Sequence, residues 1–525
     1  MSDRGILVLD IGLSAVKACL YALDGRVLAE ARRPLVTHSP SPGWYVQDPV
    51  DWWQAVVEST GQMRAVAADW TVEGVGVTGH MHAPVLVDEA GTPVIECPVL
   101  WDRRPEAEWA ELEAPFNIRA HHAQTGGRVG PQAVPAKLRW MATHRPDAMK
   151  RARALLAPKD YLRSRLTGKV GTDPTDAAGL LLFDIHRGTW AHDLAAAAGI
   201  SPAIFPSIMP SASVAGGVTP EAADALDLVP GTPVIAGAGD DVEAVGLGAI
   251  HPGDVYEHLG STGTLGVVTD HAVLDPQLRV ETVPHAYAGR WIVGGSTNAA
   301  CAGLDEVLRL MGDHAGDGVG YGGVALPLGS PARRPFFLPY LAGERAPLWD
   351  DALRGALVGL ELTTDRQELL ASVMEGIAFS LRDISEVLGE LGLTRRSVYA
   401  SGGGATIDGW AQLRASVYGL PIITPRQADA TSRGTFFLTA VALGIFPSLD
   451  EALQAMPVDG DTSVPDNTTA AYEARYRAFR TLVDTLTPWF RTSAQALHGT
   501  RGCEHGTTLR GHRCAWRASR MTGRY

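Results

Sequence analysis

Two strand–turn–strand units constrain the fold of this chain most strongly. In the first, the apolar residues 6–9 run into the turn 10–15, and a second apolar segment ends at Tyr21. In the second, residues 255–259 run into the turn 260–264, and a further apolar segment ends at Val268. Short apolar runs bounded by glycine predict paired strands joined by tight turns. Because each unit begins its own half of the chain, we predict a duplicated architecture with a ligand held between the halves.

The segment 234–248 presents two adjacent carboxylates before a helix of small residues. It starts as a short apolar run, turns at Gly237 and Gly239, and reaches Asp240 and Asp241. Ligands of α/β proteins bind at the carboxyl ends of the strands, so we interpret Asp240 as a catalytic base beside bound phosphate. The alternative is that Asp240 caps the following helix, which is a common role of aspartate.

The length of 525 residues is too great for a single core and predicts two large domains. We expect an N-terminal domain over residues 1–248 and a C-terminal domain over residues 249–491. Residues 492–525 hold six arginines and one acidic residue, with few aliphatic side chains. This composition predicts a disordered basic tail.

Charge and cysteine content exclude several classes of protein. The net charge of −13 argues against nucleic acid as a partner. The five cysteines are scattered and odd in number, which fits reduced thiols in a cytosolic protein. There is no signal-peptide pattern and no uninterrupted apolar window of about 18 residues. We therefore expect a cytoplasmic protein without a membrane partner, and the sequence leaves open whether it is a monomer or a homodimer.

The clearest predicted helix covers residues 365–391. Apolar residues recur at helical spacing from Leu369 onward, Thr364 with Gln367 makes a capping-box pattern, and Gly392 closes the other end. Further helices are predicted from Pro49 to about residue 68, from about 136 to 143, from about 435 to 444, and from about 470 to 491.

Three small-residue turns carry the chemistry that the sequence indicates. They cover residues 10–15, 260–264 and 402–405, and each follows a predicted strand. The common phosphate-loop, zinc-protease and nucleophile-elbow motifs are missing from the sequence, and no complete G-x-G-x-x-G follows a predicted strand. Glycine turns of this kind can place backbone amides around phosphate. Together with the carboxylates of Asp10 and Asp240, they indicate a site for nucleotide phosphate and Mg²⁺.

A series of motifs occurs in a defined order from about residue 6 to residue 490. They are Asp10-Ile-Gly12 with Lys17, Gln47-Asp-Pro49 with Trp52-Trp53, Gly79-His-Met81-His82, Pro158 to Arg163, Asp176 to Gly179, Gly237 to Asp240, Gly260 to Gly263, Leu338 to Pro347, Gly355 to Leu360 with Glu368-Leu369 and Ser372 to Glu375, and Gly402 to Ala405 with Trp410 and Gln412. In this order the chain resembles the FGGY family of carbohydrate kinases, and most of all its xylulokinase branch. The stretch that begins at Gly355 matches the family's carboxyl-half signature at every constrained position.

The resemblance implies an α/β fold of two actin-like ATPase (ribonuclease H-like) domains with an interdomain cleft. The sugar would lie in the cleft on the first domain, and ATP mainly on the second. By position, Asp240 resembles the base that takes the proton of the sugar hydroxyl, and Asp10 resembles the carboxylate that positions Mg²⁺. Met81 and His82 match the sugar-binding pair.

The resemblance also implies contacts to ATP from both domains. They are Gly12 and Ser14 in the first phosphate turn, Gly260, Ser261, Thr262, Gly263 and Thr264 in the loop over the ATP phosphates, and Gly403, Gly404 and Ala405 in the nucleotide-contacting turn. The first turn departs from the family pattern, because Leu13 and Ala15 stand where Thr and Gly are usual.

Other departures lie around the expected sugar pocket. Asp241 stands where xylulokinases tend to have Asn, and His80 and Ala83 replace Gln and Gly. The segment 101–105 is one residue shorter than the usual Trp-x-Asp-x-Arg, so either Asp102 or Arg103 is expected to contact the sugar. Polar groups of a pocket determine which substrate it accepts, so these changes bear on the sugar more than on the reaction.

The expected activity is the ATP- and Mg²⁺-dependent phosphorylation of the terminal hydroxyl of a small sugar. D-xylulose, giving D-xylulose 5-phosphate, is the substrate that the resemblance implies. One alternative is another polyol or ketose, such as glycerol, ribulose or a tetritol. A second alternative, motivated by Leu13 and Ala15, is a degenerate kinase that binds nucleotide as a regulator.

Overall fold

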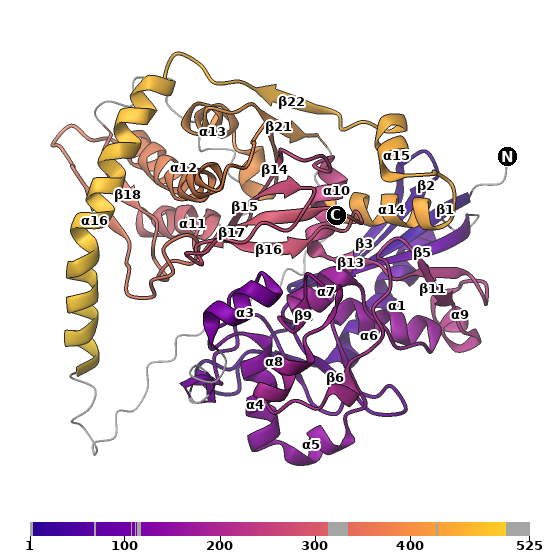
Figure 1. Cartoon of the computed structure of the whole chain (residues 1–525). Coiled ribbons are helices and arrows are strands. Elements are labelled where there is room, and N and C mark those ends of the chain that lie inside the picture. Colours follow the sequence, from indigo (N-terminus) through magenta and orange to yellow (C-terminus); the bar gives the residue numbers. More distant parts are fainter. Residues whose placement is uncertain are drawn as a thin grey trace.

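The computed structural model describes residues 4–67, 70–106, 108–110, 112, 117–312, 334–426 and 429–499. Over these residues the chain forms two α/β bodies, and each is built on a seven-stranded sheet. In Figure 1 the earlier part of the chain forms the body at the right and bottom, and the part that follows residue 250 forms most of the body at the upper left.

The first sheet has the strand order β11-β12-β5-β1-β2-β3, and β13 also pairs with β5. Its strands are β1 Arg4–Ile11, β2 Ala15–Ala22, β3 Val27–Pro34, β5 Thr71–Gly79, β11 Val214–Gly217, β12 Pro233–Ile235 and β13 Ala238–Gly239. β1 is antiparallel to β2, β2 is antiparallel to β3, and β1 is parallel to β5.

The second sheet has the strand order β16-β17-β15-β14-β20-β21-β22. Its strands are β14 Asp254–Leu259, β15 Gly263–Thr269, β16 Glu281–Pro284, β17 Trp291–Thr297, β20 Ser397–Ser401, β21 Ile422–Pro425 and β22 Gly460–Ser463. β14 is antiparallel to β15, β15 is antiparallel to β17, and β14 is parallel to β20. This pairing repeats that of the first sheet, so the duplicated architecture predicted from the two strand–turn–strand units is confirmed.

Helices surround both sheets (Figure 1). They are α1 Pro49–Val66, α3 Ile118–Thr125, α4 Val134–His144, α5 Pro146–Arg151, α6 Pro158–Thr167, α7 Pro174–Gly179, α8 His192–Ala197, α9 Pro220–Leu226, α10 Glu243–Leu247, α11 Cys301–Leu310, α12 Arg366–Glu390, α13 Trp410–Tyr418, α14 Ala430–Ala442, α15 Leu449–Ala455 and α16 Thr469–Gly499. Short strands complete the structure: β4 Val46–Gln47, β6 Val85–Val87, β7 Cys97–Pro98, β8 Ala154–Leu156, β9 Phe183–Asp184, β10 Thr189–Trp190, β18 Phe336–Leu338 and β19 Ala356–Val358.

The long helix α12 lies close to its predicted bounds, but its cap is different. The capping box joins Asp365 and Glu368, where each side chain accepts a hydrogen bond from the backbone of the other. The predicted pair of Thr364 and Gln367 is therefore wrong by one position. Asp365 has the extended backbone of an N-cap, and its carboxylate satisfies a backbone amide of the first turn.

Helix α14 belongs to the later part of the chain but packs on the first sheet. It contacts β1, β5 and α10, and the ring of Phe436 lies 5.0 Å from that of Tyr21. The helix begins at Ala430, earlier than expected, because Asp429 caps it through the amide of Ser432. We propose that the domain boundary lies between residues 248 and 249, and that α14 returns from the second part of the chain to pack on the first sheet.

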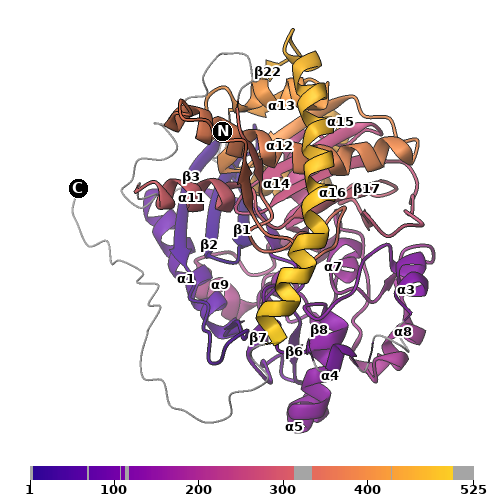
Figure 2. The same ribbon diagram turned by 90° about the vertical axis from the view of Figure 1, so that its left-hand side faces the viewer.

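Helix α16 runs along the outside of the second body (Figures 1 and 2) and continues to Gly499. The expectation of disorder from residue 492 is therefore wrong for residues 492–499, where helical backbone hydrogen bonding continues despite the change in composition. Residues 500–525 lie outside the described residues. Among the helices of the described ranges, none is long and apolar enough to cross a membrane.

Candidate active site

Asp240 lies at the carboxyl edge of the first sheet. The chain leaves β12, turns at Gly237, forms β13 and enters a 3₁₀ turn over Asp240–Val242. Gly237 has φ of 74°, and a Cβ there would overlap the carbonyl oxygen of Val77, so this tight approach requires glycine. Neither the 3₁₀ turn nor α10 has a side-chain cap, so the interpretation of Asp240 as a helix cap is wrong.

The strand register brings Asp10 and Asp240 to the same edge. β1 and β13 flank β5 as parallel neighbours, and Ile11 of β1 and Gly239 of β13 both pair with Gly79. Each carboxylate is adjacent to the residue that makes this pair. Two residues far apart in the sequence therefore meet at the end of β5.

The protein around these carboxylates controls their ionisation, although Asp240 is exposed to solvent and Asp10 is half-buried. Loss of hydration in this setting raises the pKa of Asp240 well above its ordinary value, and the negative charges of Asp241 and Asp10 raise that pKa further. Burial and the neighbouring Asp429 raise the pKa of Asp10 to about 7, and the ammonium of Lys17 opposes this rise. Perturbed carboxylates that converge in this way are typical of functional sites.

The donor set at this edge fits Mg²⁺. Mg²⁺ is usually held by one or two carboxylates together with water and substrate phosphate, rather than by a cage of protein ligands. Asp10 supplies a hard oxygen donor, and the nearby carboxylate of Asp240 adds negative charge at the same edge. Within the described residues there is no group of three or more His, Cys, Asp or Glu side chains that could hold a metal by itself.

A cavity of about 130 Å³ lies between the two bodies. Met81, His82 and Asp241 line it from the first half of the chain, and Thr264 and Glu281 line it from the second. The structure thus brings the expected sugar-binding pair, Asp241 and the last residue of the expected phosphate loop to one cavity.

His82 is held in a defined orientation at this cavity. Its backbone has φ of 61°, a strained value for a residue with a side chain, and such strain is found at functional sites. Its Nδ1 lies 2.8 Å from the carbonyl oxygen of Gly179. Burial lowers the pKa of His82 to about 4, so the ring is neutral near pH 7. Because the carbonyl can only accept, Nδ1 donates to it, and Nε2 is left as an acceptor.

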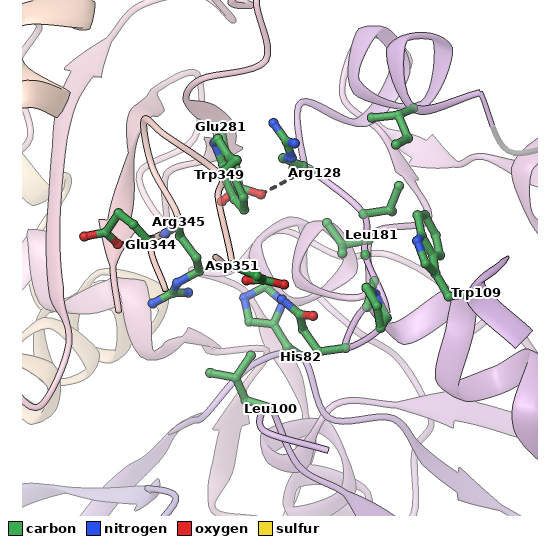
Figure 3. A pocket seen from close by; sticks show the side chains of 16 residues that line it. His82, Leu100, Trp109, Arg128, Leu181, Glu281, Glu344, Arg345, Trp349 and Asp351 are labelled. Atoms are coloured by element: carbon green, nitrogen blue, oxygen red, sulfur yellow. Dashed lines mark hydrogen bonds between the residues drawn. The ribbon is translucent and has the colours of Figure 1, made fainter. Parts of the chain in front are cut away.

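A second cavity of about 270 Å³ adjoins the first, with His82 and Glu281 lining both (Figure 3). Arg128, Arg345 and Asp351 also line it. The amide of Arg128 donates to the Glu281 carboxylate at 2.8 Å, the contact drawn as a dashed line in Figure 3. No sequence motif contains Arg128, Glu281 or Asp351, whereas Arg345 lies in one of the matching segments.

Asp102 and Arg103 lie in different environments. Asp102 is fully buried and accepts hydrogen bonds from the amide of Tyr45 and from the side chain of Arg104. The side chain of Arg103 is half exposed, and its Nη2 lies 3.5 Å from Asp351, which lines the larger cavity. Of the two, Arg103 is the one placed toward the cleft, and Asp102 braces the loop beneath it.

The two glycine turns of the second body lie together at its carboxyl edge. The turn 260–262 joins β14 to β15, and the amides of Ala300 and Cys301 at the start of α11 donate to its carbonyl oxygens. Thr264 forms a hydrogen bond of 2.8 Å with Ser296. The turn that holds Gly403, Gly404 and Ala405 follows β20, the parallel neighbour of β14. The residues of this body that are expected to contact ATP therefore share one edge.

The first phosphate turn lies at the end of β1, beside Asp10. Ser14 is exposed, and its hydroxyl accepts a 3.4 Å hydrogen bond from Arg32. The side chain of Gln47 donates to the carbonyl oxygen of Leu13 and holds the turn in place. Gly12 and Ser14 thus lie on the first body, next to the carboxylate expected to position the metal.

A link between the bodies lies behind Asp240, and the sequence did not predict it. Glu243 on α10 accepts hydrogen bonds from Tyr256 and His258 of β14, each at 3.0 Å. The charge of Glu243 raises the pKa of His258 to about 9. Although burial opposes it, the positive charge of His258 holds the pKa of Glu243 below its ordinary value. The pair is charged at neutral pH and ties α10 to the second sheet.

Comparisons with known proteins agree with this arrangement. Residues 5–246 match the N-terminal domain of the FGGY family of carbohydrate kinases, and residues 255–443 match its C-terminal domain. A xylulose kinase of Escherichia coli strain K12 is 31% identical over 484 residues, which is 91% of this chain and 99% of that protein. A gluconokinase of Bacillus licheniformis is 25% identical over 464 residues, covering 85% of this chain and 89% of that protein.

A solved structure gives the same result at the level of the fold. The crystal structure of xylulose kinase from Rhodospirillum rubrum is similar with a TM-score of 0.84 and 31% identity, covering 93% of this chain and all of that one. Two α/β domains around a cleft, with this topology, are the actin-like ATPase fold. The chain belongs to the FGGY family of carbohydrate kinases. It is a sugar kinase, and the expected family, fold class and enzyme class are confirmed.

Proposed function

We propose that this kinase transfers the γ-phosphoryl group of ATP to the terminal hydroxyl of D-xylulose, giving D-xylulose 5-phosphate. The observation that carries the proposal is the cavity that Met81, His82, Asp241 and Thr264 line together. A sugar held by the first three would have its reacting end between Asp240 and the turn 260–264. The similarity to xylulose kinases at 31% identity supports the choice of sugar.

Asp240 serves as the general base in this proposal. In phosphoryl transfer the proton of the attacking hydroxyl leaves late, so a carboxylate is a strong enough acceptor, and most of the catalysis comes from positioning and charge stabilisation. Asp240 must be ionised to accept the proton. Because the pKa of Asp240 is raised, activity should increase with pH as more of the carboxylate becomes ionised. Positive charge bound in the complex should lower that pKa and shift the increase to lower pH.

The remaining residues bind and orient the substrates. His82 offers Nε2 as an acceptor to a sugar hydroxyl, and Asp241 accepts from a second hydroxyl. The amides of residues 260–264, with Gly12 and Ser14 opposite, hold the phosphates, and Gly403 to Ala405 contact the nucleotide. Asp10 would hold Mg²⁺ together with the ATP phosphates, and the ion, when bound, would neutralise phosphate charge and so favour attack by the hydroxyl.

A panel of sugars with ATP and Mg²⁺, read as ADP release, tests the substrate. D-xylulose should give the largest kcat/KM, above ribulose, glycerol, a tetritol and gluconate. A larger value for another sugar would reject D-xylulose and keep the kinase, and gluconate is included because a gluconokinase is among the similar proteins. ATP binding without turnover of any sugar would favour the alternative of a degenerate kinase that binds nucleotide as a regulator.

The variant Asp240→Asn tests the base. General-base assistance is worth about 10²- to 10⁴-fold, so kcat should fall by that factor while the protein stays folded. The matched control is Asp147→Asn, which changes a carboxylate that is 97% exposed on α5 and lines neither cavity, so kcat should stay within about 2-fold of the wild-type value, as surface changes usually do. Equal turnover by Asp240→Asn and the wild type would reject the assignment.

A further inference from the structure

The segment that leads to Asp240 is held from the side opposite β5 by buried polar groups. The amide of Gly239 donates to the hydroxyl of Thr175 at 2.8 Å. Three residues earlier, the carbonyl oxygen of Ala236 accepts a hydrogen bond of 3.1 Å from the guanidinium of Arg163. Because β13 has only two residues and few strand hydrogen bonds, these contacts do much to hold its backbone in position.

The hydroxyl of Thr175 can only act as an acceptor toward Gly239. Its single hydrogen is donated to Asp173 at 2.8 Å, and the hydroxyl of Ser211 donates to the same carboxylate oxygen at 2.7 Å. The other oxygen of Asp173 lies 3.0 Å from Nζ of Lys159. All four side chains are buried. The lone pair of Thr175 is therefore directed at the Gly239 amide by a fixed network, not by chance rotation.

The helix that carries Thr175 also orients the sugar-binding pair. The carbonyl oxygen of Gly179, at the end of α7, receives the hydrogen bond from His82. The side chain of Met81 packs between Gly179 and Gly239. A Cβ added at Gly179 would lie 2.6 Å from Cε of Met81, and a Cβ added at Gly239 would lie 2.6 Å from Sδ of Met81. One short helix thus sets the spacing between the strand that delivers Asp240 and the residues that face the sugar.

The network beneath α7 is costly to bury. Lys159 lies within 3.0 Å of oxygens of Asp160, Asp173 and Asp176, and Arg163 lies 2.9 Å from Asp160. Groups of buried charges lose hydration on folding, and apolar replacements are often equally stable or more so. A gain in stability is therefore a weak explanation for this network. Its directed hydrogen bonds can instead position the neighbouring backbone.

We infer that Thr175 is a positioning residue, whose hydroxyl fixes the Gly239 amide and thereby places the carboxylate of Asp240 against the sugar hydroxyl. The inference rests on the proposed role of Asp240 as the base. A reacting group that is displaced by a fraction of an ångström loses much of its effect, since catalysis of this kind depends on alignment. The role is indirect, because Thr175 reaches Asp240 only through the backbone.

The test compares Thr175→Val, which keeps the shape and loses the hydroxyl, with Thr175→Ser, which keeps the hydroxyl. We expect kcat of the Val variant to fall about 10- to 100-fold, with KM for sugar and ATP changed by less than about 2-fold, and the Ser variant to recover most of the loss. Thr60→Val is the matched control: Thr60 is fully buried on α1 and, over the described residues, its hydroxyl has no hydrogen-bond partner, so kcat should not change.

A double variant asks whether Thr175 acts through Asp240. In an Asp240→Asn background, Thr175→Val should cause little further loss, since the carboxylate that it places is gone. Losses that multiply in full would overturn the inference, as would a rise in KM with kcat unchanged. If the Val variant does not fold, Thr175→Ala, which also removes the hydroxyl, carries the same expectation and the same power to refute it.

The two proposals fail in different ways. Full activity of Asp240→Asn would overturn the base assignment itself. A slow Asp240→Asn variant beside a fully active Thr175→Val variant would overturn the positioning role and leave the base assignment standing.

Discussion

Nζ of Lys17 lies 2.7 Å from the carboxylate of Asp429, so a residue of the second strand is paired with the cap of helix α14. Lys17 also faces Asp10 across the antiparallel pair of β1 and β2. The same lysine therefore joins the two halves of the chain and adjusts the charge of the carboxylate proposed to position Mg²⁺.

Lys17→Met should weaken the use of Mg²⁺. Without the ammonium, the pKa of Asp10 rises above its value of about 7, so less of the carboxylate is ionised at neutral pH. The apparent KM for Mg²⁺ should rise several-fold at pH 7, because less of the carboxylate is ionised, and should recover toward pH 8.5. Asp429→Asn is the opposing variant: it removes a negative charge, keeps a capping side chain and should lower the pKa of Asp10. A KM for Mg²⁺ that does not respond to either change would contradict this role.

Asp241→Asn should remove a pH dependence of sugar binding. Burial, with the charges of Glu243 and Glu281, raises the pKa of Asp241 to about 6. In the wild type, KM for the sugar should therefore rise as pH falls through 6, because the carboxylate that accepts a sugar hydroxyl becomes protonated. In the Asn variant KM should be nearly flat between pH 5 and pH 7.5, measured from initial rates with ATP saturating. An Asn variant that keeps the wild-type pH dependence would show that another group titrates.

His258→Gln should reduce stability most at low pH. The pKa of His258 is raised from 6.5 to about 9, so its contribution is fully present below pH 6.5 and is lost as pH rises through 9. We expect a loss in the free energy of unfolding of about 1–2 kcal/mol below pH 6.5, after allowing for partial exposure of the ring, and much less at pH 9.5.

The exposed pair of His271 and Asp270 provides the control for that measurement. Its atoms are 2.6 Å apart, but both side chains are mostly exposed, so His271→Gln should change urea unfolding very little at any pH. An equal effect of the two histidine variants would mean that burial of the Glu243–His258 pair adds nothing to the free energy of unfolding.

Gly237→Ala should destabilise the first body and slow catalysis. A Cβ at this position meets the carbonyl oxygen of Val77, and φ of 74° already disfavours side chains, so we expect a loss of about 2–4 kcal/mol in the free energy of unfolding. Gly289→Ala separates the two causes. Gly289 has φ of 77° and nothing within 4 Å of an added Cβ, so only the backbone strain of about 1 kcal/mol should be seen there. Equal losses in both variants would show that the contact with Val77 relaxes freely.

The sequence predicts the parts of this kinase that local patterns encode. Glycine turns between apolar runs identify the strands that pair at β1–β2 and β14–β15, and α1 begins at Pro49 as predicted. The capping box of α12 was misplaced by one residue because Thr364 and Asp365 are both plausible caps, and only the backbone geometry distinguishes them.

Contacts across the cleft could not be predicted in the same way. Glu281 begins a strand and Arg128 lies in a loop, and neither has neighbours in the sequence that reveal its role. Similarly, nothing local shows that the amide of Gly239 meets Thr175, since that contact depends on how α7 packs beside β13. Residues that act through long-range packing require the fold before they can be recognised.

The return of α14 to the first sheet affects the order in which the chain can mature during synthesis. Ile6, Val8 and Tyr21 form one buried cluster with Phe436 and Leu438 of α14. A ribosome that has released only residues 1–248 has therefore produced a sheet with one apolar face uncovered. Multidomain chains usually fold from the amino terminus as each unit emerges, but this first unit is completed only after residues 430–442 have been translated. A fragment ending at residue 248 should consequently bind chaperones or aggregate through this uncovered face.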